Sequence, residues 1–542
     1  MQLAVVTLLY GVLTFLMALP FSASPGSRVL DDAPDMHLFI WTLAWDTHAF
    51  LHQPINIFDA NIYYPFANTL AYSENLIGSA LFAAPIIWLT GNMVLATNLT
   101  ALLSCVLCGT GAYLLARRVH ITIAGALVCG LIFAFAPPRF FRISQLHLTA
   151  VQWIPFTLAF LHTYLESGRR SQLLLAIACF SLQALSSGHG AVYVLLSVLA
   201  LLAWHVAFGG AVDVGKRLAD VGAAGLYLLA PSVWVMLPYR IAQDDAGLRR
   251  GYLPDALPGI ENFLASPARF HLFLKQTFLE PIPQEPTAFL FPGFLVVILA
   301  AVAVMTAARR PWRSNAAAFY LLVAVVSTLM FVDWPISLWR YVYWLPGFNF
   351  TRVPSRFMIL TMMALSVLAG IGVDQLLARL TSRARSIAAI AFGLLFLGEY
   401  NSYPMASDPF EIAIPAVDRW LDTRPKPFVV AELPVPSEGN RGALERQQTR
   451  AMLHATAHWQ KTIHGYSGIR QPFHDQLYRD LNGFPNPTSI ERLHEVGVTY
   501  VVVHTEDYDI RWRTIEEAIA RSGALKLEYA DGPGRVYSLV PR

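Results

Sequence analysis

The amino-acid sequence predicts a polytopic α-helical membrane protein that ends in a small soluble α/β domain. Of its 542 residues, 55% are hydrophobic and only 14% are charged, and the mean hydropathy is +0.47. These values are typical of chains whose helices are surrounded by lipid. Long apolar runs recur up to about residue 400, whereas residues 401–542 are charged and rich in turn-forming residues. The net charge of +3 is too small to indicate a nucleic-acid partner.

Apolar runs predict about eleven membrane-spanning helices, because a helix needs about 20 apolar residues to cross the hydrocarbon and irregular backbone is excluded there. These runs lie at residues 3–19, 93–116, 121–136, 150–165, 172–187, 191–208, 221–237, 288–307, 316–331, 357–377 and 387–400. The run from Leu76 to Leu89 is shorter and contains Pro85, so we expect a re-entrant or interfacial segment, with a crossing as the alternative. The first run lacks a basic region and a clear cleavage site, which favours a retained anchor.

Basic residues fix the expected orientation, since Lys and Arg in short loops stay on the cytoplasmic side. They occur at Arg117/Arg118, Arg169/Arg170, Lys216/Arg217, Arg309/Arg310/Arg313 and Arg379/Arg383/Arg385. The N-terminus is then inside. We therefore expect a multi-pass protein of the inner (cytoplasmic) membrane, with a module at 1–400, a first outer loop at 21–75, and the domain at 401–542 on the periplasmic side.

The last part of the chain predicts alternating strands and helices. The apolar runs FVVAEL, VTYVVV and RVYSLV, which begin at Phe428, Val498 and Arg535, are typical of buried strands. Helical patterns lie at 444–459, 489–496 and 510–522. No phosphate-binding loop or catalytic triad is recognisable in this part. We expect it to position an acceptor or to cap the site.

The first outer loop concentrates acidic side chains close to the membrane. Its carboxylates are Asp31, Asp32, Asp35, Asp46, Asp59 and Glu74. From Asp35 to His52 the residues follow a helical period that places Trp41 and Trp45 on one apolar face. Tryptophan is enriched at the boundary between lipid and water, so the pattern predicts a helix lying in the headgroup layer. Carboxylates in an outer loop next to the membrane suggest a reaction on a lipid-borne substrate.

The motifs DMHLFIWTLAWDTHAF, FDANIYYPFANTLAYSE, FPG and RVPSRF, which begin at Asp35, Phe58, Phe291 and Arg352, give the chain a family resemblance. In this order they resemble a bacterial branch of the GT-C superfamily of membrane glycosyltransferases. The resemblance implies a polyprenyl-phosphate sugar as donor and an acid of the first outer loop as catalytic base. Asp35 matches by position in the pattern D-x5-W-x-L-A-W, while the doublet Asp31/Asp32 leaves the choice open among the three.

Such a reaction needs a base and positive charge. The base takes a proton from an acceptor hydroxyl, whose oxygen attacks the anomeric carbon with inversion while the lipid phosphate leaves. Arginine binds phosphate through two parallel bonds, and four arginines near outer membrane edges are candidates: Arg352, Arg356, Arg139 and Arg142. Candidates for substrate binding at the outer ends of apolar runs are Glu74, His147, His189 and Glu285. The sequence specifies no cofactor, although a divalent metal ion held by Asp31, Asp32 or Glu74 could replace one cation.

Each candidate also has a structural alternative. Asp35 could favour the start of a helix through the helix dipole, the arginines could anchor the outer interface, and the histidines could make structural hydrogen bonds. Two other functions compete with transfer: transport of a lipid or solute, and a non-catalytic membrane scaffold. Few ionisable residues lie deep in the spans, which weighs against a transporter. The sugar and the acceptor, whether glycan, lipid or protein, are left open.

Overall fold

The computed structural model describes residues 1–208, 214–228, 230–245, 257–278, 288–307, 315–333, 336–345, 348, 351, 353–437 and 439–541. The chain forms two compact units. Unit 1 contains Met1–Pro25, Asn98–Met236 and Arg249–Ser407, and unit 2 contains Gly26–Thr97, Leu237–Leu248 and Asp408–Arg542. Residues 26–75 of the predicted first outer loop therefore belong to the same unit as the C-terminal residues.

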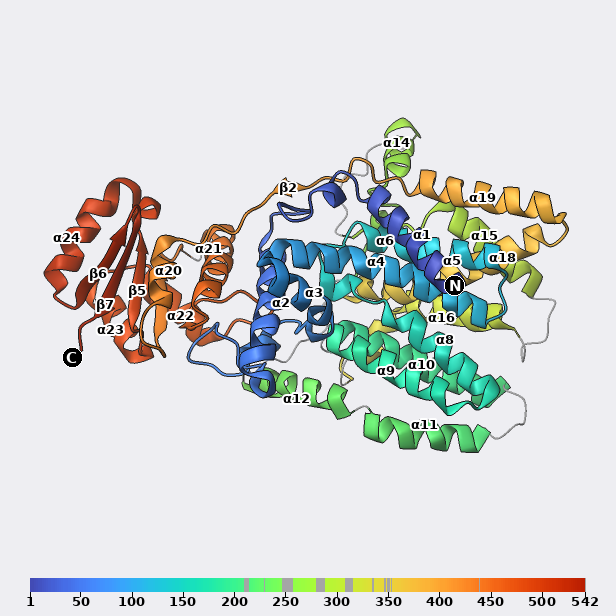
Figure 1. The fold of residues 1–542 in the computed structure, drawn as a ribbon, viewed down its shortest axis with the longest axis horizontal. Coiled ribbons are helices and arrows are strands. Elements are labelled where there is room, and N and C mark those ends of the chain that lie inside the picture. Colours follow the sequence, from blue (N-terminus) through green and yellow to red (C-terminus); the bar gives the residue numbers. More distant parts are fainter. Residues whose placement is uncertain are drawn as a thin grey trace. The chain divides into compact units, whose positions relative to one another are not determined.

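Unit 1 is helical (Figure 1). Its helices are α1 (Gln2–Met17), α4 (Met93–Arg118), α5 (Ile123–Phe135), α6 (Pro137–Phe140), α7 (Leu146–Thr149), α8 (Trp153–Ser167), α9 (Arg170–Ser186), α10 (Gly188–Phe208), α11 (Val214–Leu228), α13 (Ile260–Phe263), α14 (Arg269–Phe278), α15 (Phe294–Ala307), α16 (Ala316–Leu329), α17 (Trp339–Val342), α18 (Met358–Leu377) and α19 (Ser382–Glu399). Helix α4 begins in unit 2, and α12 (Ala230–Asp245) also crosses the boundary.

Four helical segments in the described part of the chain are long and apolar enough to cross a membrane: Met93–Arg118, Ile123–Phe140, Gly188–Phe208 and Pro354–Leu377. Helices α1, α15 and α16 are apolar but shorter. The predicted number of eleven is therefore not reached by length and composition. The expected helix at 221–237 instead falls across two helices, α11 and α12.

Small residues allow the helices of unit 1 to pack closely. A Cβ atom added at Gly372 of α18 would lie 2.1 Å from the backbone oxygen of Leu299 in α15, and one at Gly125 of α5 would lie 2.3 Å from the oxygen of Gly370. Small residues bring membrane helices into this kind of backbone contact. Helix α18 is buried along most of its length. In contrast, large apolar side chains of α19, such as Ile390 and Leu394, are exposed, as expected for a lipid-facing surface.

The FPG motif forms the turn before α15. Gly293 has a positive φ of 108°, and a Cβ atom there would lie 2.9 Å from the Tyr400 ring. Its neighbour Glu399 accepts hydrogen bonds from the backbone amides of Phe294 and Leu295 at the start of α15. A carboxylate at a helix N-terminus satisfies amides that have no partner within the helix. The motif is thus explained by local structure.

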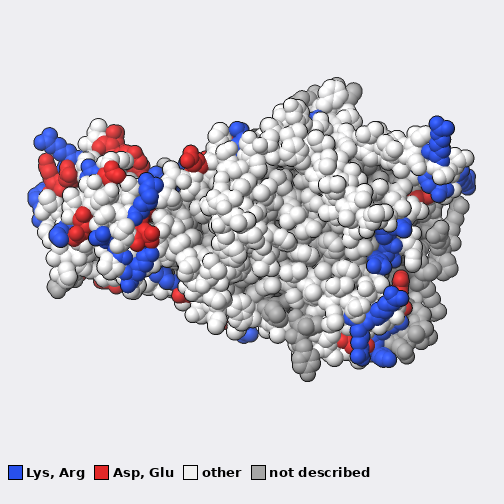
Figure 2. Space-filling model, viewed as in Figure 1, with Lys and Arg blue, Asp and Glu red and all other residues white. Residues whose placement is uncertain are grey.

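The face of the molecule in Figure 2 shows few charged side chains over most of the helices of unit 1. Lys and Arg gather at the end of this unit where α18 leads into α19. The sequence places Arg379, Arg383 and Arg385 at this turn. An uncharged band with a basic edge is the pattern expected where helices leave the membrane.

Unit 2 contains a five-stranded sheet of order β4-β3-β5-β7-β6. Its strands are β3 (Val429–Leu433), β4 (Lys461–Thr462), β5 (Tyr500–His504), β6 (Leu525–Asp531) and β7 (Gly534–Leu539), and a separate antiparallel pair joins β1 (Arg28–Val29) to β2 (Asp408–Pro409). Strand β3 is parallel to β4 and β5, whereas β7 is antiparallel to β5 and β6. The helices of the C-terminal part are α20 (Ala416–Asp422), α21 (Arg441–His454), α22 (Pro472–Leu481), α23 (Pro487–Val496) and α24 (Trp512–Ser522).

Both faces of the central strands are covered, which explains their continuous apolar sequences. Val501 and Val503 pack in one hydrophobic cluster with residues of α21 to α24, while Val502 packs in a second cluster with Val417 and Leu421 of α20. The three strands predicted from FVVAEL, VTYVVV and RVYSLV match β3, β5 and β7. The predicted helical patterns match α21, α23 and α24, which confirms an α/β arrangement for the end of the chain.

The first-loop part of unit 2 contains α2 (Pro34–His52) and α3 (Ile77–Thr90). The expectation that α2 presents its tryptophans to lipid headgroups is wrong. Trp41 and Trp45 are 1% and 2% exposed, and the Trp45 indole donates a hydrogen bond to the backbone oxygen of Ile57 at 2.9 Å. The Trp459 ring lies 6.0 Å from the Trp45 ring, and His48 stacks on it with ring centroids 4.4 Å apart. Helix α2 is therefore a core element of unit 2.

Candidate functional site

Asp35 lies in the first turn of α2, where its carboxylate is half-buried. The Tyr466 hydroxyl donates a hydrogen bond to Asp35 Oδ1 at 2.8 Å. Burial, and then the Asp35 carboxylate, raise the pKa of Tyr466 above its usual range, so the phenol keeps its proton and remains a donor. Pro34 begins the helix, where its missing amide hydrogen costs no bond within the helix.

Asp31 and Asp32, immediately before α2, are exposed. Asp32 Oδ1 lies 2.7 Å from His37 Nε2, and His37 Nδ1 lies 3.1 Å from the Thr449 hydroxyl. The pKa of Asp31 is raised by burial and then by the carboxylates of Asp408, Asp35 and Asp32. The structure thus gathers the three predicted candidate bases at one end of α2.

A large cavity in unit 2 reaches Asp32, one of these three acids. Its volume is about 960 Å³, and its walls include Asp32 and His37 together with Arg450, His454 and His504 from the C-terminal part. Pockets that hold small ligands have volumes of about 300–1,000 Å³. The cavity is therefore large enough to hold a sugar residue.

A second group, here called the basic cluster, lies in unit 1 and consists of Arg142, His147, His189 and Arg356. Arg356 Nη1 lies 2.6 Å from His189 Nε2, and the His147 and His189 rings are 6.0 Å apart between centroids. Burial and the charge of Arg356 lower the pKa of Arg142. Burial and the same arginine, followed by His189, lower the pKa of His147 well below its usual range. Four predicted binding residues are thus brought together, with two guanidinium groups close enough to repel one another.

A small cavity of about 20 Å³ adjoins Arg142 and Arg356, which is close to the space that one water molecule needs. Arg139 lines it as well, but this residue is 1% exposed and its guanidinium donates to the backbone oxygens of Ala134 at 2.8 Å and Thr149 at 3.0 Å. These bonds hold the turn between α5 and α8, so the structure gives Arg139 an anchoring role.

Three other predicted residues lie elsewhere. Glu74 is buried in unit 2, where its charge acts on the Tyr239 phenol, and Tyr239 Oη accepts hydrogen bonds from the backbone and side chain of Asn75 at 2.8 and 2.9 Å. Arg352 and Glu285 lie outside the described residues. Tyr466 and His37 were not predicted, because a contact with a residue about 400 positions away leaves no periodic signal in the sequence.

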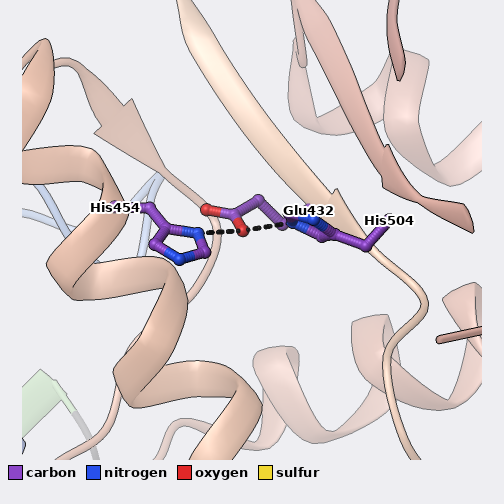
Figure 3. A group of neighbouring side chains, drawn as sticks. All are labelled: Glu432, His454 and His504. Carbon is purple, nitrogen blue, oxygen red and sulfur yellow. Dashed lines mark hydrogen bonds and ion pairs between the residues drawn. The ribbon is translucent and has the colours of Figure 1, made fainter. Parts of the chain in front are cut away.

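The structure also contains a buried group in the C-terminal part that was not predicted: Glu432, His454 and His504 (Figure 3). Glu432 Oε2 lies 2.9 Å from His454 Nδ1 and 2.8 Å from His504 Nε2. Burial would raise the pKa of Glu432, but the two histidines hold it well below its usual range. Burial and Glu432 raise the pKa of the neighbouring Asp418 to about 7. A sequence signal existed, since Glu432 and His504 lie at the carboxyl ends of two buried runs.

The chain shares its fold with solved glycosyltransferases, which supports the predicted GT-C resemblance at the level of fold. Among solved structures, the arabinofuranosyltransferase AftD from Mycobacteria is similar over 100% of this chain and 40% of its own, with a TM-score of 0.60 and 16% identity. The oligosaccharyltransferase of Archaeoglobus fulgidus in the apo form is similar over 99% of this chain and 74% of its own, with a TM-score of 0.51 and 13% identity. No protein-family model and no curated protein sequence matches the chain.

Proposed function

We propose that this chain is a GT-C glycosyltransferase that moves a sugar from a polyprenyl-phosphate donor to an acceptor outside the cytoplasm. The observation that carries this proposal is the GT-C fold over the whole chain, shared with an arabinofuranosyltransferase and an oligosaccharyltransferase. Three acids at the start of α2 add the chemistry that such a reaction needs.

Asp35 is the proposed base. Its Oδ1 is oriented by the hydrogen bond from Tyr466, which leaves Oδ2 to take the proton of the acceptor hydroxyl. The acceptor oxygen then forms a bond to the anomeric carbon from the face opposite the phosphate, the bond from that carbon to the phosphate oxygen breaks, and the configuration inverts. General base catalysis of this kind contributes roughly 10²–10⁴-fold to the rate. Asp31 and Asp32 are the alternative bases.

The basic cluster is the proposed binding site for the donor phosphate. Burial and then the charge of Arg356 lower the pKa of Arg142, and a bound phosphate would offset the repulsion between the two guanidinium groups. Arg352 remains a proposed phosphate ligand. Arg139 holds the backbone next to the basic cluster through its bonds to the oxygens of Ala134 and Thr149. His147 and His189 contribute hydrogen bonds to the donor, and Glu74 and Glu285 remain proposed substrate contacts.

A divalent metal ion at the first-loop acids remains a proposal as well. Hard cations such as Mg²⁺ prefer carboxylate oxygens, and Asp31 and Asp32 are exposed side by side. Burial and then the neighbouring carboxylates raise the pKa of Asp31, so a cation there would relieve the repulsion among these acids. The ion would supply positive charge at the leaving phosphate. Glu74 has a buried environment beside Tyr239 and fits this role less well.

The proposed topology has eleven spans in the inner membrane, with a membrane module at 1–400 and the domain at 401–542 on the periplasmic side. The basic edge near the turn from α18 to α19 supports an inward orientation for that end. The cavity of about 960 Å³ in unit 2 is the proposed site for a glycan, lipid or protein acceptor.

The test uses the purified full-length chain in detergent or in lipid vesicles, supplied with radiolabelled polyprenyl-phosphate sugars. Transfer of label to an added membrane extract, or slow release of free sugar by hydrolysis, is the expected result. Label accumulating inside vesicles without transfer would replace the proposal with a transporter. Binding of the labelled donor without transfer, hydrolysis or uptake would indicate a non-catalytic scaffold.

A further inference from the structure

Four buried ligand-type side chains meet beneath the sheet of unit 2. Side chains alternate between the two faces of a strand, so Glu432 of β3 points to the same face as Val430, and His504 of β5 to the same face as Val502. This is the face that α20 covers. Asp418 of α20 and His454, the last residue of α21, complete the group.

The charges in this group are not balanced by Lys or Arg within the described part of the chain. Glu432 forms ion pairs with His454 and His504, and Asp418 lies within ion-pair distance of His454 and His458. Asp418 is 0% exposed, and neither of its carboxylate oxygens has a hydrogen-bond partner among the described residues. A buried carboxylate without hydrogen bonds is costly, and a bound cation would offset this cost.

The spacing suits one ion. Zinc binds histidine nitrogen and carboxylate oxygen at about 2.0–2.2 Å, so two atoms on the same ion lie at most about 4.4 Å apart. Glu432 Oε2 lies 2.9 and 2.8 Å from the two histidine nitrogens, and His454 Nδ1 lies 4.0 Å from Asp418 Oδ2. The ligand atoms of Glu432, His454 and His504 all lie within 4.8 Å of one another. This bound exceeds the 4.4 Å limit by only about 0.4 Å, so small side-chain movements would let these atoms bind one ion.

We propose that Glu432, His454 and His504 (Figure 3), together with Asp418, bind a divalent transition-metal ion of the zinc type. Two imidazoles and two carboxylates are a ligand set that such ions accept. Four protein ligands close the coordination sphere, so the ion has a structural role. It joins α20, α21 and the carboxyl ends of β3 and β5, which fixes one wall of the large cavity, because His454 and His504 also line that cavity.

His458 lies beside Asp418 and would hold that carboxylate in place without binding the ion itself. The backbone amide of Gln460 donates to His458 Nδ1 at 3.0 Å, so the ring carries its proton on Nε2. That nitrogen lies 3.8 Å from Asp418 Oδ1 and has no hydrogen-bond partner among the described residues. Once the other oxygen of Asp418 binds the ion, a small rotation brings Oδ1 within reach of this donor. Hydrogen-bond donors next to a metal site orient the carboxylates that bind the ion.

The test uses the full-length protein in detergent, purified without a histidine tag, treated with a chelator and then titrated with Zn²⁺ or Co²⁺. We expect one ion per chain by elemental analysis, visible absorption bands of tetrahedral Co²⁺, and a higher melting temperature with Zn²⁺. His504→Gln and Asp418→Asn should each weaken binding by at least about 10-fold, the range for lost metal-site partners. His474→Gln changes another buried histidine of the same unit and should bind as the wild type does.

Two results would overturn the proposal: a wild-type protein that takes up no Co²⁺ in stoichiometric amount, or variants at Glu432, His504 and Asp418 that bind as tightly as the wild type. The wild-type stoichiometry and cobalt spectrum require no substitution, so a variant that fails to fold does not prevent a decision. Metal binding is measured without sugar transfer, and its outcome is independent of the proposed function.

Discussion

The buried acid Asp46 of α2 provides a quantitative test of the structure of unit 2. It is 0% exposed, neither oxygen has a hydrogen-bond partner among the described residues, and burial raises its pKa well above the ordinary value of 3.8. A raised pKa in the folded state stabilises the fold fully below pH 3.8, and this contribution is lost as the pH rises toward the folded-state pKa. Between pH 3.8 and the folded-state pKa, each pH unit lowers the free energy of unfolding by about 1.4 kcal/mol. At pH 7 the loss reaches about 4 kcal/mol, as an upper limit, if Asp46 still holds its proton.

Asp46→Asn removes this titration and keeps the shape of the side chain. We expect the variant to be more stable than the wild type at pH 7, by up to about 4 kcal/mol, and to match it near pH 4. Denaturant unfolding in detergent can be followed by tryptophan fluorescence, because Trp41 and Trp45 lie on the same helix. The control is Asp59→Asn, an acid of the same loop that pairs with Lys461 at 2.8 Å. Equal stability of Asp46→Asn and the wild type at both pH values would refute the reasoning.

Three further substitutions test the basic cluster, the C-terminal part and the helix packing. Arg356→Gln removes a charged donor and should raise the KM for a polyprenyl-phosphate sugar by about 10–100-fold, measured by initial rates, since a hydrogen bond from a charged group contributes roughly 1.5–3 kcal/mol; an unchanged KM would remove this residue from donor binding. His474 donates to the backbone oxygen of Tyr64, and burial lowers its pKa to about 4. A histidine kept neutral by folding stabilises the fold fully above pH 6.5, and this contribution is lost as the pH falls toward 4. His474→Gln should therefore show a smaller fall in melting temperature over this pH range, corresponding to at most about 3 kcal/mol of unfolding free energy. An identical pH profile for the variant and the wild type would contradict this. Gly372→Ala places a Cβ atom 2.1 Å from the oxygen of Leu299 and should lower stability by about 1–3 kcal/mol, whereas an unchanged melting temperature would show that α15 and α18 are not in backbone contact.

Much of the fold could be predicted from local sequence patterns. Strands β3, β5 and β7 could be predicted because buried parallel and central strands are continuously apolar. Arg142, His147, His189 and Arg356 were chosen because they lie near the ends of apolar runs, and the structure brings them together; their role in binding stays a prediction. The number of membrane-spanning helices could not be predicted in this way. Hydropathy recognises apolar runs, but several helices of unit 1, such as α8 and α15, are shorter than a full crossing and are packed through glycine contacts that a hydropathy window does not register.

Contacts between distant parts of the sequence were beyond prediction. Periodicity gave α2 an apolar face with two tryptophans, which suits lipid and a protein core equally well. Only the packing of Trp45 near Trp459 decides for the core. Similarly, the hydrogen bond from Tyr466 to Asp35 and the meeting of Glu432 with His454 and His504 depend on the register of the sheet. Such groups are found by asking which polar residues end neighbouring buried strands.

The most direct test of the proposed mechanism is sugar transfer by the Asp35→Asn variant. The assay compares initial transfer rates from a radiolabelled polyprenyl-phosphate sugar for the wild type, the variant, and a triple variant in which Asp31 and Asp32 are also changed to Asn. We predict a rate at least about 100-fold lower for Asp35→Asn, with donor binding and folding preserved. Wild-type rates in both variants would contradict the claim that an acid of the first outer loop is the base.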